Sequence, residues 1–173
     1  KPIKRLVQQA KKIANGDYQQ PIKLKDKSEL GQLANEFNAM QQAVLTREQE
    51  ITHRANHDSL TELPNRNILV KKLNQLIEEK VSFQIFHLNL SRLKDVNETL
   101  GHDVGDWLIQ RTAARLQILS QFELLCHLGG DEFVLLFIKQ DKHSIDSLAE
   151  SINKKLEEHC DYRGINLQLQ ARM

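Results

Sequence analysis

The stretch from Leu124 to Phe137 constrains the fold of this chain more than any other. Two apolar runs flank the pentapeptide Gly129-Gly130-Asp131-Glu132-Phe133, and a Gly-Gly pair suits a tight turn that needs positive φ. We therefore predict a β-hairpin. Its turn places two adjacent carboxylates, those of Asp131 and Glu132, beside backbone that a ligand can approach without meeting a Cβ. Acidic groups beside bare backbone suit a metal-bound phosphate.

Length, charge and cysteine content narrow the class of protein. The chain has 173 residues, enough for one full domain and a smaller element, and its net charge of +1 gives no argument for nucleic acid as a partner. Cys126 and Cys160 lack metal-ligand spacing, so we expect free thiols in the cytoplasm. No stretch reaches the roughly 20 apolar residues that span a bilayer. Because the chain begins at Lys1 and stops at Met173 after a strand-like run, we expect a piece of a longer protein.

Two amphipathic helices are predicted near the N-terminus. The first ends at Asn15-Gly16-Asp17, an extended connector covers residues 18–27, and the second helix opens near Asp26 or Ser28. Short helices of this kind cannot bury their apolar seams alone, so we expect a dimer. The seam residues are Ile3, Leu6, Ala10 and Ile13, then Leu30, Leu33, Phe37, Met40 and Val44.

The first helix is also strongly basic. Five cations precede the first acidic residue, Asp17, and they are Lys1, Lys4, Arg5, Lys11 and Lys12. Such a run fits a segment that leaves the membrane on its cytoplasmic side, near anionic lipid. A solvated basic helix face is the alternative interpretation.

Helices and strands follow one another through the rest of the chain. We predict a helix after the Pro64-Asn65 turn, a strand over 81–90, a helix ending at Gly101, a helix over 104–119, the hairpin, a helix over 144–158 and a strand over 166–172. This order predicts an α/β or α+β layer structure.

The N-terminal segment resembles a HAMP linker. The matching residues are Pro2-Ile3, Ala14-Asn15-Gly16-Asp17, Ser28-Glu29-Leu30-Gly31 and Phe37-Asn38-Ala39-Met40. The resemblance implies a parallel four-helix homodimer that couples an upstream transmembrane sensor to a cytoplasmic output. We expect the α-helical coiled-coil HAMP segment to cover residues 1–48 and a signalling helix to cover 49–56.

The remainder resembles a GGDEF domain, over 57–173. The resemblance rests on His57 to Arg66, on Lys94 to Asp106, and on Gly129 to Phe133. It implies an α/β (α+β) nucleotidyl-cyclase-like fold, of which we expect the C-terminal elements to be missing here. It also implies that two domains of a homodimer each hold one GTP and condense them to cyclic di-GMP, with positioning and charge neutralisation supplying most of the rate.

The resemblance assigns roles to single residues. Asn97 and Asp106 match the guanine contacts, although Asn97 could instead cap a turn and Asp106 could cap the following helix. Lys94, with the backbone amides of Ser91 to Lys94, matches the phosphate-binding turn, beside Gly129 and Gly130. Asp131 and Glu132 match the catalytic and metal-binding carboxylates, which by themselves could be solvated charges.

Several positions depart from the family pattern. Asn89-Leu90-Ser91 stands where the family has Asp-x-Asp, so the Mg²⁺ site keeps the backbone of Leu90 but has an amide at Asn89, and an amide is a poor ligand for a hard dication. Three further positions differ from the residues usual in the family: Leu93 stands in place of a Phe, His127 in place of an Arg, and Glu62 in place of a Gly. The inhibitory product-binding Arg-x-x-Asp falls on Ser120-Gln121-Phe122-Glu123, which has no guanidinium.

These observations favour a membrane-linked cyclic di-GMP signalling module whose GGDEF domain binds guanine nucleotide, with a weakened Mg²⁺ site, and cyclises poorly or not at all. An active diguanylate cyclase, with Asp131 and Glu132 holding the metals, is one alternative. The other is a regulatory domain for an EAL phosphodiesterase downstream of Met173.

Overall fold

The structure is a computed structural model that describes residues 7–8, 22, 29–119, 122–138, 142–167 and 171–172. The chain divides into two compact units, Lys1–His53 and Arg54–Met173. None of the described helices is long and apolar enough to cross a membrane.

The principal described element of the first unit is helix α2 (Glu29–Asn56), as the seam of apolar residues predicts. Asn38 of α2 forms two hydrogen bonds to the backbone of Ile22. Its Oδ1 accepts from the Ile22 amide at 2.8 Å, and its Nδ2 donates to the Ile22 carbonyl at 3.1 Å. The other predicted connector residues lie outside the described part, as does the first helix apart from helical Val7 and Gln8.

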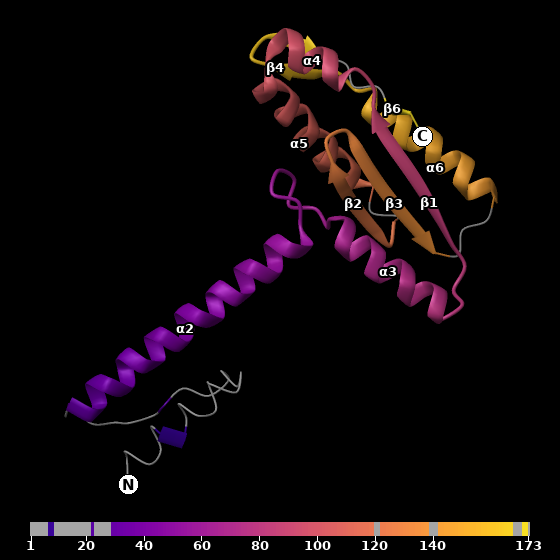
Figure 1. Ribbon diagram of the computed structural model, residues 1–173. Coiled ribbons are helices and arrows are strands. Elements are labelled where there is room, and N and C mark those ends of the chain that lie inside the picture. Colours follow the sequence, from indigo (N-terminus) through magenta and orange to yellow (C-terminus); the bar gives the residue numbers. More distant parts are fainter. Residues whose placement is uncertain are drawn as a thin grey trace. The chain divides into compact units, whose positions relative to one another are not determined.

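The second unit is built on an antiparallel sheet (Figure 1) in the order β2-β3-β1-β6. Its strands are β1 (Phe83–Leu90), β2 (Leu124–Gly129), β3 (Glu132–Ile138) and β6 (Ala171–Arg172). The predicted hairpin is confirmed as β2 and β3, with φ of 110° at Gly129 and 59° at Gly130. At both glycines a side chain would strain the backbone, which explains the Gly-Gly pair.

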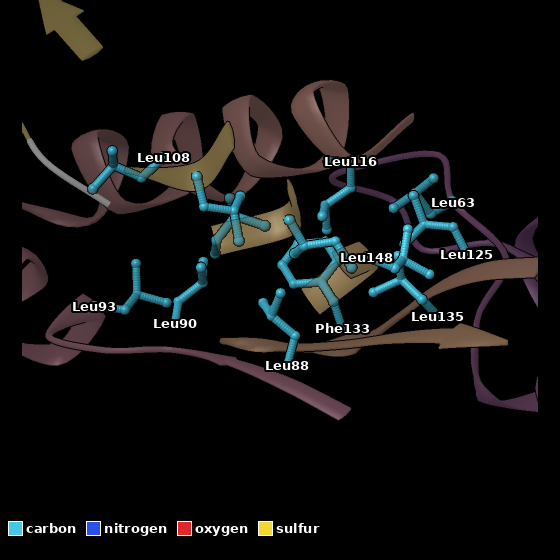
Figure 2. Packing of buried hydrophobic residues seen from close by; sticks show 14 of the residues in the cluster. Leu63, Leu88, Leu90, Leu93, Leu108, Leu116, Leu125, Phe133, Leu135 and Leu148 are labelled. Atoms are coloured by element: carbon cyan, nitrogen blue, oxygen red, sulfur yellow. The ribbon is translucent and has the colours of Figure 1, made fainter. Parts of the chain in front are cut away.

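One face of the sheet carries the main core. Phe133 of β3 lies between Leu88 of β1, Leu116 of α5 (His102–Ile118) and Leu148 of α6 (Lys142–Leu156), as Figure 2 shows. Fully burying a Leu or Phe side chain contributes about 1.5–3 kcal/mol, so this layer holds α5 and α6 on the sheet. On the opposite face, α3 (Arg66–Glu78) packs through Leu69 against Cys126 and Val134.

The remaining elements correct the predicted boundaries. Helix α4 (Leu93–Leu100) ends before Gly101, as predicted, but α5 begins at His102 rather than 104. Helix α6 begins and ends two residues earlier than the predicted 144–158. The predicted strand over 166–172 was wrong as one element. A small hairpin, β4 (Cys160–Tyr162) and β5 (Ile165–Leu167), takes its first part, and of its described residues only those of β6 pair with the main sheet.

Candidate functional site

A cavity of about 540 Å³, here called the strand-end cavity, opens where β1 ends. Asn89 and Leu90 of β1, the turn at Ser91 and Arg92, and the start of α4 line one side. The other side is formed by Asp131, by Asn153 of α6, by Glu157 just after α6, and by Arg172 of β6. Arg92 has a φ of 66°, a conformation that costs energy in residues with a Cβ. The first amides of α4 lack intrahelical partners, which favours an anion here.

A second cavity of about 440 Å³, here called the helix-pair cavity, lies beside the first. The two share Leu93, Lys94 and Asp131, and the second adds Asn97, Glu98, His102 and Gly130. Two adjoining cavities of this size suit a ligand with two chemically different halves.

Asn97 is the polar group most clearly lacking a partner in this region. Its Oδ1 is buried and has no hydrogen-bond partner among the described residues. The amide packs against Gly105 of α5, where a Cβ would overlap Oδ1, so only glycine admits the side chain in this position. An unpaired buried carbonyl oxygen is costly, and a ligand that donates a hydrogen bond would remove that cost.

The structure brings some of the predicted site residues together and leaves others apart. Asn97, Lys94 and Gly130 line the helix-pair cavity with Asp131, and Asn89 and Leu90 line the strand-end cavity. Neither cavity is lined by Gly129, by Glu132, or by Asp106, which is exposed on α5.

In the strand-end cavity, sequence reasoning missed Asn153 of α6, Glu157 just after α6, and Arg172 of β6. They come from the C-terminal third of the chain and carry no motif. Only the packing of α6 on the sheet and the pairing of β6 with β1 bring them to the cavity.

The charges around Asn89 decide how well Mg²⁺ fits. Asn89 lies directly opposite Glu132 of β3 on one side and Arg172 of β6 on the other, and opposed residues of antiparallel strands project to the same face. Across β3, β1 and β6, one face of the sheet therefore carries a carboxylate, an amide and a guanidinium side by side. No group of three His, Cys, Asp or Glu that could hold a metal exists among the described residues. Magnesium prefers anionic oxygen ligands, so these residues fit it poorly.

His127 joins the loop before α3 to the glycine turn. The ring is 2% exposed, its Nδ1 lies 2.8 Å from the Asp58 carboxylate and its Nε2 lies 3.0 Å from the Gly130 carbonyl. The ring bridges these two acceptor groups. It stacks on Phe133 with ring centroids 4.6 Å apart. The His127 ring takes the position where the family has an Arg.

Two side chains in this region have shifted pKa values. Partial burial would raise the pKa of Asp58, but hydrogen bonds from His127 and Thr61 outweigh it and lower the pKa below its ordinary 3.8. Burial raises the pKa of the Cys126 thiol to about 12, so it is a packing group rather than a nucleophile.

An antiparallel sheet with helices on both faces, and a glycine turn beside two adjoining cavities, defines an α+β class of domain. The sequence profile described as "Diguanylate cyclase, GGDEF domain" matches residues 55–173, and the HAMP domain profile matches 1–46. The chain belongs to the GGDEF family, with a HAMP segment preceding the GGDEF domain.

Named relatives agree with this membership. Signaling protein YkoW of Bacillus subtilis is 36% identical, over 64% of this chain and 15% of its own length. The bifunctional diguanylate cyclase/cyclic di-GMP phosphodiesterase MucR of Pseudomonas aeruginosa is 34% identical, over 63% of this chain and 17% of its own. The chain thus spans less than a fifth of the length of these two relatives.

A solved structure gives the same fold. The coiled coil and GGDEF domain of DgcB from Caulobacter crescentus, in complex with c-di-GMP, superposes with a TM-score of 0.71. The match covers 83% of this chain and 80% of that one, at 19% identity. At that identity the likeness establishes the fold alone.

Proposed function

We propose that this chain is a regulatory module of cyclic di-GMP signalling, whose GGDEF domain binds guanine nucleotide and has little or no diguanylate cyclase activity. The observation that carries the first half is Asn97, which lines the helix-pair cavity and whose buried Oδ1 has no partner among the described residues. The observation that carries the second half is the amide of Asn89 at the end of β1, between Glu132 and Arg172.

The chain's own residues would divide the nucleotide between the two cavities. The Asn97 amide offers both a donor and an acceptor to the guanine edge, and its Oδ1 suits a ring N–H. Lys94 and the first amides of α4 would hold phosphate oxygens near the end of β1. Asp131 lines both cavities, where the ribose between base and phosphates would lie.

Poor cyclisation follows from charge. In the family a carboxylate at the position of Asn89 ligates magnesium, which neutralises the triphosphate as the bond to the α-phosphate forms. Losing about 4 kcal/mol of that stabilisation would slow turnover roughly a thousandfold. The domain would then bind substrate without consuming it, which suits a regulatory role.

The surroundings of the domain are part of the proposal. The HAMP match and the basic run of the first helix support a homodimer on the cytoplasmic face of the membrane, downstream of a transmembrane sensor. Feedback by product at the usual inhibitory site is not expected, because Ser120 to Glu123 has no arginine.

Two further functions have an observation in their favour. An active cyclase is supported by the two turn carboxylates, Asp131 and Glu132, which this chain keeps. A regulatory domain for a downstream EAL phosphodiesterase is supported by the bifunctional relative MucR. Sequencing the gene beyond Met173 tests the second directly.

Calorimetric titration of the chain with GTP and with ATP tests nucleotide binding. We expect GTP to bind and ATP to bind at least tenfold more weakly, because adenine offers no donor matching the guanine N1–H. Asn97→Ala should weaken the binding of GTP about tenfold, because a buried hydrogen-bonding amide is lost. Asn74→Ala, on exposed surface of α3, is the control and should change nothing. Equal affinity for both nucleotides would reject guanine recognition.

A further inference from the structure

We infer that Arg172 binds the polyphosphate of the nucleotide directly and takes the place of a divalent cation in this domain. The inference rests on the proposed binding of guanine nucleotide and adds which group neutralises its phosphates. It assigns a binding role to a residue that no motif of the sequence marks.

The position of Arg172 follows from strand register. Its partner across the β1–β6 ladder is Asn89, and the next pair along that ladder joins Leu90 to Ala171. Asn89 in turn faces Glu132 of β3. Side chains directly opposed in such ladders have Cβ atoms about 4.5–5.5 Å apart. The long arginine side chain therefore begins next to the amide that would otherwise be a metal ligand, and it lines the strand-end cavity.

The charge balance in that cavity favours an anion. Arg92, Lys94 and Arg172 supply three cationic side chains, against the carboxylates of Asp131 and Glu157. Lys94 is 3.8 Å from Glu98, but its side chain is 85% exposed, and exposed pairs of this kind exchange readily for other partners. The amides at the start of α4 add partial positive charge.

The same arrangement disfavours a dication. A magnesium ion placed at Asn89 would meet that amide with the Glu132 carboxylate on one side and the Arg172 guanidinium on the other, and the guanidinium repels it. The same guanidinium attracts a phosphate group, because arginine presents parallel N–H donors that match two phosphate oxygens. GTP without magnesium also carries more negative charge than its magnesium complex, so a cationic site binds it at least as well.

The test is calorimetric titration of the whole chain with GTP and with guanosine, in magnesium and in EDTA. We expect the Kd for GTP in EDTA to be equal to or lower than that in magnesium. Arg172→Gln should raise the Kd for GTP about tenfold or more, because a charge-assisted bidentate contact is lost. The Kd for guanosine should stay within about twofold of the wild-type value. Arg111→Gln, on exposed surface of α5, is the matched control and should change neither ligand.

Each alternative result has a definite meaning. Loss of GTP binding in EDTA, with binding intact in magnesium, overturns the inference and leaves the proposed function standing. If Arg172→Gln weakens the binding of GTP and of guanosine equally, the inference is overturned too, because damage to the fold then explains the lost affinity. A wild-type chain that binds neither ligand in either buffer rejects the proposed function and this inference together.

Discussion

Glu62 has a φ of 58°, in a region where residues with a Cβ are strained by about 1–2 kcal/mol. The turn that requires it is tightly bonded, with the Glu62 amide donating to Asp58 O at 2.9 Å and the Asp58 amide donating to Leu63 O at 2.8 Å. The family's usual glycine at this position is thereby explained.

Replacing Glu62 should reveal this strain. We expect Glu62→Gly to be more stable than Glu62→Ala by about 1 kcal/mol, because only glycine adopts positive φ without penalty. Comparing the two variants removes any contribution of the glutamate side chain itself. Urea unfolding of both measures the difference, and equal midpoints would show that the backbone is relaxed.

Asp58 makes a pH-dependent contribution to stability. Its pKa in the folded state is below the ordinary value of 3.8, so the unfolded chain binds the proton more readily. The contribution is complete above that ordinary value and is lost as pH falls through the lowered pKa. The unfolding free energy of wild type should therefore fall more steeply than that of Asp58→Asn between about pH 5 and pH 2.5. Parallel curves would contradict the contact with His127.

At the scale of elements, α2 presents apolar side chains to solvent in a single chain. Leu33 is 54% exposed and Met40 is 52% exposed, and both belong to the seam predicted to bury in a dimer. Phe37 and Val44 of the same seam are only half-buried. Exposed apolar residues repeated on one helix face favour a second helix as partner.

A charge on this seam should separate the dimer. We expect Met40→Lys to raise the dimer dissociation constant about tenfold or more, because a lysine at the interface must be desolvated or expelled. Asn35→Lys adds the same charge at an exposed position outside the seam and is the control. Sedimentation equilibrium measures the dissociation constant of both variants. An unchanged constant for Met40→Lys would show that the dimer interface does not include this seam.

Elements that depend on local sequence were predictable, and those that depend on distant pairing were not. The hairpin was confirmed because two glycines supply both positive φ values at the turn itself. The approach of Arg172 to Asn89 joins distant parts of the chain, and no local pattern indicates it. The split of the predicted strand over 166–172 is an exception with a local cause, since the turn at Gly164, with φ of 87°, closes a separate hairpin that the sequence analysis missed. Asn97, Lys94 and Asp131 stay predictions as nucleotide contacts, now with a shared cavity to support them.

At the scale of the molecule, the second unit contains a series of hydrogen bonds that links Asn56 to the candidate site. The Asn65 amide donates to Asn56 O at 2.9 Å, and the His127 amide donates to Pro64 O at 3.0 Å. The His127 ring then contacts Gly130, which lines the helix-pair cavity. The loop before α3 and the glycine turn are therefore held together by both backbone and side chain.

We propose above that this domain recognises GTP but does not convert it efficiently. The most direct measurement is the amount of cyclic di-GMP formed when the purified chain is incubated with GTP and magnesium, beside an Asn89→Asp variant under the same conditions. We expect little or no product from the wild type, although it binds GTP, and more product from Asn89→Asp, which restores an anionic ligand. Ready turnover of GTP by the wild type would contradict the account.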